Sequence, residues 1–241
     1  MPETDALFAN LQTVHATARA EPQTLRISVD TKAKVKVAPF SRGGRARGAE
    51  SVRAADHDMR PDAVLAPAGI LEVDRGQLNI VFGTSRDTSD FVADALDLWW
   101  ADRQPFYPKV RRLLIDLDNG PEVGSSRTQF LNRLVAFADR TRLTLELAYY
   151  PPYHSKYNPV ERCWGILENH WNGALLTTVA TTLEWAKTMT WRGVRPIVHL
   201  LDRVYRTGVK LTKAAFRPVA ARLNRSETLP KWSLVIHPAY G

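Results

Sequence analysis

Three acidic residues occupy positions from which their carboxylates could act together on a phosphodiester. Asp30 ends the apolar run LRISVD, Asp118 lies in RRLLIDLDNG, and Glu161 opens an apolar helix in YNPVERCWG. The first two runs predict β-strands and the third predicts a helix, so a single fold could bring the three side chains together. This pattern predicts metal-dependent phosphoryl transfer on nucleic acid.

Such chemistry needs several carboxylates because the attacking and leaving oxygens each require a cation, with the two ions ~3.5 to 4 Å apart. Aspartate oxygens can bridge both ions, and a third carboxylate can complete the coordination of one. Mg²⁺ takes oxygen ligands and keeps several waters. Asp30, Asp118 and Glu161 are therefore the candidate ligands, and we expect two Mg²⁺ ions.

Each acid also has an ordinary structural interpretation. Asp30 could begin a turn after its strand, and Asp118 precedes an Asn-Gly dipeptide that favours a tight turn. Asn158 suits a helix N-cap, and Glu161 then occupies the position of the reciprocal carboxylate in a capping box. Taken together, the two strand ends and the helix start favour catalysis.

A fourth acid, Asp116, lies two residues before Asp118 and would share its face of a strand with a period of two. Its neighbours are apolar, so an unpaired carboxylate buried there would be costly. This favours Asp118, at the open strand end, as the ligand. The role of Asp116 stays open.

The charge of the chain indicates a polyanionic partner. The formal net charge is +8 and the pI is near 9.8, and such a surface attracts nucleic acid. Lys156 lies on the loop that leads to Glu161 and could contact DNA. His154, on the same loop, could contact a phosphate or orient a water. A Gly-rich segment supplies further candidate contacts to the DNA backbone, namely Arg42, Arg45 and Arg47.

Composition excludes several classes of protein. With 241 residues and 44% apolar residues, the chain can bury one full core. No stretch approaches the ~18 to 20 consecutive apolar residues of a membrane span, and the first residues lack the pattern of a signal peptide. The single cysteine, Cys163, excludes an internal disulfide and a multi-thiolate zinc site. We expect a cytoplasmic protein.

Hydrophobic periodicity predicts an α/β chain. The expected order is strand, strand, strand, helix, strand, helix, strand, helix, preceded by a helix over residues 5–19. It is the order of an RNase H-like fold, with a mixed sheet flanked by helices and a site at the strand ends. The strands are expected at 25–30, with a continuation over 31–40, and at 69–74, 77–83, 111–118 and 143–150, and the helices at 89–103, 125–141 and 158–171.

This pattern predicts that the chain is divided into three parts. We expect an N-terminal helix in residues 1–24, a catalytic core in 25–174 and a mostly helical C-terminal lobe in 175–241. Residues 41–67, rich in Gly, Arg and Ala, predict a long exposed loop. In the lobe, helices are expected at 181–189, 196–206 and 213–225.

Three strings of the sequence resemble the acidic blocks of a known family. ISVDTK, RRLLIDLDNG and YYPPYHSKYNPVERCWG are similar to the blocks of bacterial insertion-sequence DDE transposases of the ISAzo-thirteen type, which are related to the mariner group. The similarity covers residues 20 to 195. It implies that Asp30, Asp118 and Glu161 are the catalytic acids, and that Mg²⁺ or Mn²⁺ supports hydrolysis at transposon ends. It also implies joining of the freed 3′-hydroxyl to double-stranded target DNA.

Two features depart from that family. The second block reads DNGPEVGSS where a Gly-rich run is usual, and only residues 1–24 precede the first predicted strand, where a helix-turn-helix region is expected. We therefore expect a catalytic domain without its DNA-reading region. A truncated element, the second product of a split gene with a DNA-binding subunit encoded upstream, and a domesticated descendant all fit this expectation. The mariner relationship implies a homodimer, and a bacterial transposase would lie at the nucleoid.

Two other functions stay open beside strand transfer. The first is an RNase H-like nuclease, since attack by water needs the same three acids without a joining step. The second is a catalytically silent DNA-binding remnant of a transposase. Metal-dependent nicking separates the enzymes from the remnant, and joining of cleaved ends separates a transposase from a nuclease.

Overall fold

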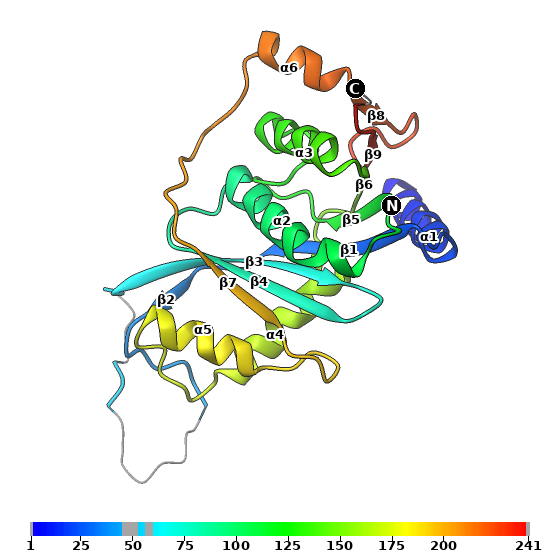
Figure 1. Ribbon diagram of the computed structural model, residues 1–241. Coiled ribbons are helices and arrows are strands. Elements are labelled where there is room, and N and C mark those ends of the chain that lie inside the picture. The colour runs from blue at the N-terminus through cyan, green and yellow to red at the C-terminus, as the bar shows by residue number, and fades with distance from the viewer. Residues whose placement is uncertain (1, 45–52, 56–59, 240–241) are drawn as a thin grey trace.

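The computed structural model of the protein describes residues 2–44, 53–55 and 60–239 (Figure 1). The described helices are α1 (Pro2–Ala20), α2 (Ser89–Arg103), α3 (Thr128–Thr141), α4 (Pro159–His170), α5 (Val179–Thr188) and α6 (Lys213–Ala220), with short 3-10 turns η1 (Gln104–Phe106) and η2 (Ser155–Tyr157). The described strands are β1 (Thr24–Thr31), β2 (Val35–Val37), β3 (Ala63–Glu72), β4 (Gln77–Gly83), β5 (Arg112–Leu117), β6 (Thr144–Tyr149), β7 (Ile197–Leu201), β8 (Leu223–Arg225) and β9 (Ser233–Ile236).

One mixed sheet organises these elements. Its strand order is β7-β4-β3-β1-β5-β6-β9-β8, and β2 pairs with β3 beside this path. β1 pairs antiparallel with β3 and parallel with β5, and β5 pairs parallel with β6. The predicted mixed sheet and its order of strands and helices up to α4 are therefore confirmed.

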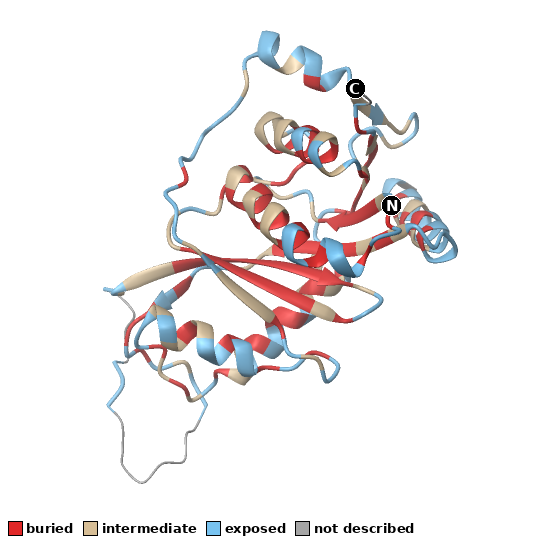
Figure 2. Ribbon diagram, in the orientation of Figure 1, coloured by how far each residue is buried: buried red, intermediate tan, exposed pale blue. Residues whose placement is uncertain are grey.

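The two faces of the sheet bury different helices. Alternation along β1 places Ile27 and Val29 in the core beneath α2 and α3, while Arg26, Ser28 and Asp30 face the opposite side. Figure 1 shows α2 and α3 on one side of the sheet and α4 and α5 on the other. Buried residues concentrate on the central strands and on the sheet-facing sides of α2 and α4 (Figure 2). Asp30 therefore lies on the face that α4 covers.

Helix α4 packs unusually close to the sheet. Its buried residues Val160, Trp164 and Leu167 form the stripe that the sequence predicts. Gly69 on β3 makes the close approach possible, because a Cβ atom there would lie 2.6 Å from the Trp164 ring and 2.9 Å from Val160. A glycine in the middle of a strand commonly marks such a site.

Two predicted boundaries are wrong. The loop expected over 41–67 ends before β3, which begins at Ala63 and runs through Pro67. Pro67 is tolerated because it lies just beyond the β1 pairing, where its carbonyl accepts the Lys32 N–H. Helix α3 begins at Thr128, three residues after its predicted start at residue 125, and its N-cap residue Arg127 makes no side-chain cap bond.

The C-terminal region contains strands where helices are predicted. Residues 196–206 hold β7, which pairs parallel with β4, and the predicted helix over 213–225 ends with α6 at Ala220, before β8. Ile197 and Val198 are β-branched, and pairing at the sheet edge outweighs their helix-like spacing. β9 pairs with β6, so this region extends both sides of the sheet. No described helix has the length and apolarity that crossing a membrane requires.

Asp116 fastens α1 to the sheet. Its carboxylate is fully buried and accepts hydrogen bonds from Arg26 on β1, at 2.9 and 2.6 Å, and forms a 2.9 Å contact with His15 on α1. Leu114, on the same face of β5, lies in the apolar cluster beneath α1. Asp116 thus has partners for both of its oxygens and a structural role.

We predict that Asp116→Asn lowers the free energy of unfolding by about 2–4 kcal/mol, because Arg26 would keep its buried charge and lose its counter-ion. Glu146→Gln is the matched control, since the Arg112–Glu146 pair joins β5 to β6 at 3.0 Å but is more exposed, and such pairs contribute at most about 1 kcal/mol. Urea unfolding of both variants measures the difference. Equal losses would contradict this role for Asp116.

Candidate active site

The parallel register of β1 and β5 brings two predicted acids to one edge of the sheet. Ser28 pairs with Asp116, so continuing the register by two residues brings Asp118 level with Asp30. Neighbouring strands lie about 4.8 Å apart. Asp30 is the last buried residue of β1, and Asp118 follows the final residue of β5. The strand-end placement of both acids is thus observed.

The turn after β5 holds Asp118 at the edge of the site. The Gly120 backbone N–H donates a hydrogen bond to the Asp118 carboxylate, while burial, the larger effect, raises the pKa of this carboxylate. The Asn119 side chain accepts the Ser125 N–H at 3.0 Å and fastens the following loop. The tight turn expected at Asn119-Gly120 is not formed, since the turn after β5 lies at residues 121–123, and the Asp118 side chain remains partly exposed.

Glu161 lies in the first turn of α4, whose start is attached to β1 by a buried polar network. The Ser28 hydroxyl accepts the Val160 N–H at 2.9 Å and donates to the side-chain oxygen of Asn158. The Asn158 amide in turn donates to the Val29 carbonyl at 3.1 Å. Ser28 and Asn158 are both fully buried. The helix that carries Glu161 is therefore tied to residues one and two positions before Asp30.

This network corrects the expected capping box. Asn158 occupies the N-cap position but makes no side-chain cap bond, because its amide is committed to β1. The cap comes instead from Ser28 on a distant strand. Sequence reasoning missed Ser28, since its only signal was a polar residue within the buried part of a strand.

The electrostatics of Asp30 reflect its neighbours. Burial, followed by the negative charges of Asp118 and Glu161, raises the pKa of Asp30 to about 8, although a hydrogen bond from Trp164 acts in the opposite sense. That indole N–H lies 3.0 Å from the carboxylate. Asp118 and Glu161 thus both act electrostatically on the buried Asp30 carboxylate.

The donor set fits a hard divalent cation. Three carboxylates offer the oxygen ligands that Mg²⁺ prefers, and a cation between them would offset the burial and repulsion at Asp30. As the side chains stand, no group of three His, Cys, Asp or Glu residues within the described ranges is arranged to hold a metal ion. The expected close cluster of carboxylates is therefore not formed in this arrangement, and the metal assignment stays a prediction.

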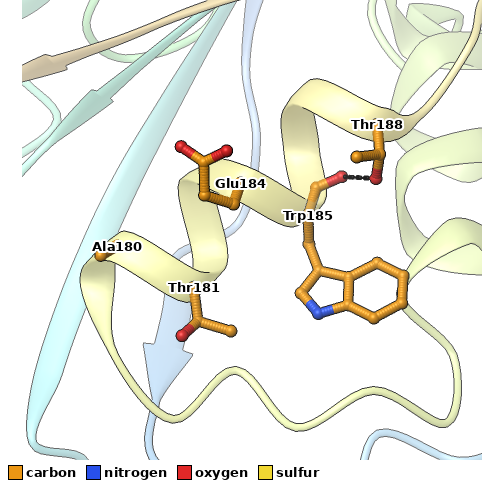
Figure 3. Close-up of a pocket in the computed structure, with 5 residues that line it drawn as sticks. All are labelled: Ala180, Thr181, Glu184, Trp185 and Thr188. Carbon is orange, nitrogen blue, oxygen red and sulfur yellow. Dashed lines mark hydrogen bonds between the residues drawn. The ribbon is translucent and has the colours of Figure 1, made fainter.

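Glu168, the other acid on α4, is already engaged. Its carboxylate forms an ion pair with Lys32 and accepts a hydrogen bond from the Trp171 indole at 2.7 Å. A surface hollow also lies apart from the three acids, on α5, where Trp185 and Glu184 line it (Figure 3). Neither feature competes with the strand edge as the candidate site.

The predicted DNA contacts on the loop before Glu161 differ in exposure. Lys156 is exposed, and its ammonium lies 5.3 Å from the centre of the Tyr157 ring. His154 is half-buried, with its ring against Phe8 of α1 and a 2.7 Å contact to the Pro152 carbonyl. Lys156 is therefore free to reach a phosphate, while His154 also braces the loop.

The Gly-rich segment is only partly described. Arg42 is half-buried, donates to the Lys36 carbonyl and lies 5.4 Å from the centre of the Trp171 ring. These contacts attach Arg42 to the end of α4. Arg45 and Arg47 lie outside the described residues, so their DNA-contact assignment stays a prediction.

We predict that Ser28→Ala costs more stability than Thr178→Ala, although each removes a hydroxyl that caps a helix. Thr178 accepts the Thr181 N–H at the exposed start of α5, and such a cap contributes ~1 kcal/mol. Ser28→Ala also leaves the buried Asn158 oxygen unpaired, which adds about 1–3 kcal/mol. Urea unfolding gives the two values, and hydrogen exchange at the Val160 amide should accelerate only in Ser28→Ala. Equal costs would show that the network does not hold α4.

Comparisons with known proteins agree with this architecture. A comparison with curated protein sequences gives no match. The solved paired-end complex of Mos1 transposase with the left transposon end is similar in fold, with a TM-score of 0.53 and 10% sequence identity over 76% of this chain. The match spans 51% of the Mos1 chain, about half its length. The family profile described as the Rhodopirellula transposase DDE domain matches residues 1–238, and the chain therefore belongs to this family of DDE-domain transposases.

Proposed function

We propose that the protein cleaves DNA at transposon ends and transfers the freed strand to a target, with Asp30, Asp118 and Glu161 as its catalytic acids. The observation that carries the proposal is the placement of these residues on β1, just after β5 and at the start of α4, around one edge of the sheet. There burial, and then the charges of Asp118 and Glu161, raise the pKa of Asp30. Membership of a DDE-domain family supports the same reaction class.

The two aspartates are fixed and the glutamate is delivered separately. Asp30 lies near the end of β1 and Asp118 directly follows β5, two paired strands, so their carboxylates suit ligands shared between two cations. Glu161 is supplied by α4, which covers the face of the sheet on which Asp30 lies, and would complete the coordination of one cation. Mg²⁺ or Mn²⁺ bound there would activate the attacking oxygen and stabilise the leaving oxygen. Trp164 holds the Asp30 carboxylate in place from the core.

Double-stranded DNA is the proposed substrate and target. The net charge of +8 favours a polyanion, and exposed Lys156 stands on the loop that leads to Glu161. We assign catalysis to residues 25–174, with residues 175–241 as an appended lobe around the sheet edges. We also propose that the protein acts as a homodimer, which the mariner resemblance supports, and that it works at the bacterial nucleoid, where its DNA substrate lies.

Substitution of the three acids tests the proposal. Asp30→Asn, Asp118→Asn and Glu161→Gln should each reduce Mg²⁺-dependent nicking of plasmid DNA by about a thousandfold or more, because each removes a cation ligand. DNA binding should stay intact or tighten, since less negative charge opposes the phosphates. Glu168→Gln is the matched control on the same helix, and it should nick at nearly the wild-type rate because Glu168 is bound to Lys32 and Trp171.

The same samples distinguish the other functions. Chelation of the metal should abolish nicking, and joining of pre-cleaved ends to a target plasmid would separate strand transfer from simple hydrolysis. Nicking that survives in Asp30→Asn and Asp118→Asn would contradict the assignment. A wild-type protein that binds DNA but neither nicks nor joins it would indicate the silent remnant.

A further inference from the structure

The loop between β6 and α4 is anchored beside both aspartates. At its start, the Tyr150 N–H donates to the Leu117 carbonyl at 2.9 Å, one residue before Asp118. At its end, Asn158 donates to the Val29 carbonyl at 3.1 Å, one residue before Asp30. The loop therefore spans the strand edge at which the acids converge.

This loop has a well-defined shape. Consecutive backbone hydrogen bonds close three tight turns, from His154 to Pro151, from Tyr157 to His154 and from Asn158 to Ser155. The Phe8 ring of α1 packs edge-on against the rings of His154 and Tyr157, with centroids 5.5 and 5.3 Å away. The loop is thus braced from one side and presents its tip to solvent.

Tyr153 occupies that tip. Its side chain is fully exposed, and no hydrogen bond, ion pair or ring contact joins it to any other residue in the described part of the chain. Its backbone φ is 63°, in the left-handed region that bulky residues rarely adopt and that costs roughly 1 kcal/mol or more. The Tyr153 ring is therefore held in solvent at a backbone cost, and it packs against no other residue that the structure describes.

The surroundings indicate what the ring would pack against. Exposed Lys156 lies three residues along the same loop, and exposed Arg162 directly follows Glu161, so the local partner is anionic. Tyr153 lies five positions before the anchored Asn158, a reach of at most about 17 Å, or about five base-pair steps of duplex. A flat ring beside cationic side chains suits a nucleotide base, since every base has a face on which aromatic rings stack.

We propose that Tyr153 stacks on an unpaired or unstacked base of the DNA strand that enters the site. This inference rests on the proposed function for its choice of DNA as substrate. Within intact duplex the base faces are already stacked on one another, so Tyr153 would select frayed, extended or cleaved ends. The loop would then position the strand beside Glu161 through a contact that carries little sequence preference.

Equilibrium binding tests the role of the ring. The probes are a short blunt duplex and the same duplex with a single-stranded 3′ extension that contains 2-aminopurine, both with Ca²⁺ in place of Mg²⁺. Tyr153→Ala should weaken binding to the extended probe by about fivefold to 150-fold and abolish the quenching of 2-aminopurine, with little change on the blunt duplex. Tyr153→Phe keeps the ring and should retain both signals.

Phe106→Ala is the matched control. Phe106 is also an exposed ring, but η1 lies near the start of β5, at the opposite end of the strands from the acids. Phe106→Ala should therefore leave binding to both probes unchanged. Unchanged melting temperatures would confirm that all variants are folded.

Three results would overturn the inference: wild-type affinity of Tyr153→Ala for the extended probe, an equal loss on both probes, or an equal loss in Phe106→Ala. Nicking with Mg²⁺, measured separately, distinguishes this failure from failure of the proposed function. If the wild-type protein nicks DNA but Tyr153→Ala changes neither the affinity for the extended probe nor the 2-aminopurine quenching, only the stacking role is refuted. If Tyr153→Ala shows the expected loss of binding and quenching but the wild-type protein never nicks DNA, only the catalytic function is refuted.

Discussion

The parallel register of β1 with β5 is the constraint on which the rest of the site depends. It brings Asp118 level with Asp30 at a shared strand edge, in surroundings buried enough that burial is the main cause of the raised pKa of Asp30. Two carboxylates held this close, with Glu161 near them, oppose folding unless other contacts offset their repulsion. The large apolar core beneath α2 and α3 supplies that stability, and a divalent cation would relieve the repulsion directly.

Polar groups then link this edge to the helix that covers it. The Ser28 hydroxyl and the Asn158 amide join β1 to α4 through buried hydrogen bonds, while Trp164 packs over Gly69 and donates to Asp30. Buried polar networks are costly unless every member is satisfied. Here their satisfaction requires α4 to start at one place on the sheet, and that requirement positions Glu161.

Sequence patterns predicted most of this arrangement because local signals were strong. Strand-end acids, an apolar stripe on α4 and the order of elements all follow from short-range periodicity. The partners of Ser28 could not be predicted, since Asn158 is 130 positions away. For the same reason, local sequence patterns could not predict the contacts of Asp116 with Arg26 and His15. The spacing of apolar residues over 196–206 predicts a helix, but pairing with β4 makes this segment the strand β7.

Anomalous diffraction from crystals grown with Mn²⁺ would test the central claim most directly. The account predicts Mn²⁺ bound by oxygens of Asp30 and Asp118 at about 2 Å, the distance typical of small hard cations, with the Glu161 carboxylate turned toward the same site. Manganese bound elsewhere, or a Glu161 carboxylate that stays about 10 Å or more from both aspartates when the metal is present, well beyond the length of a coordination bond, would contradict it.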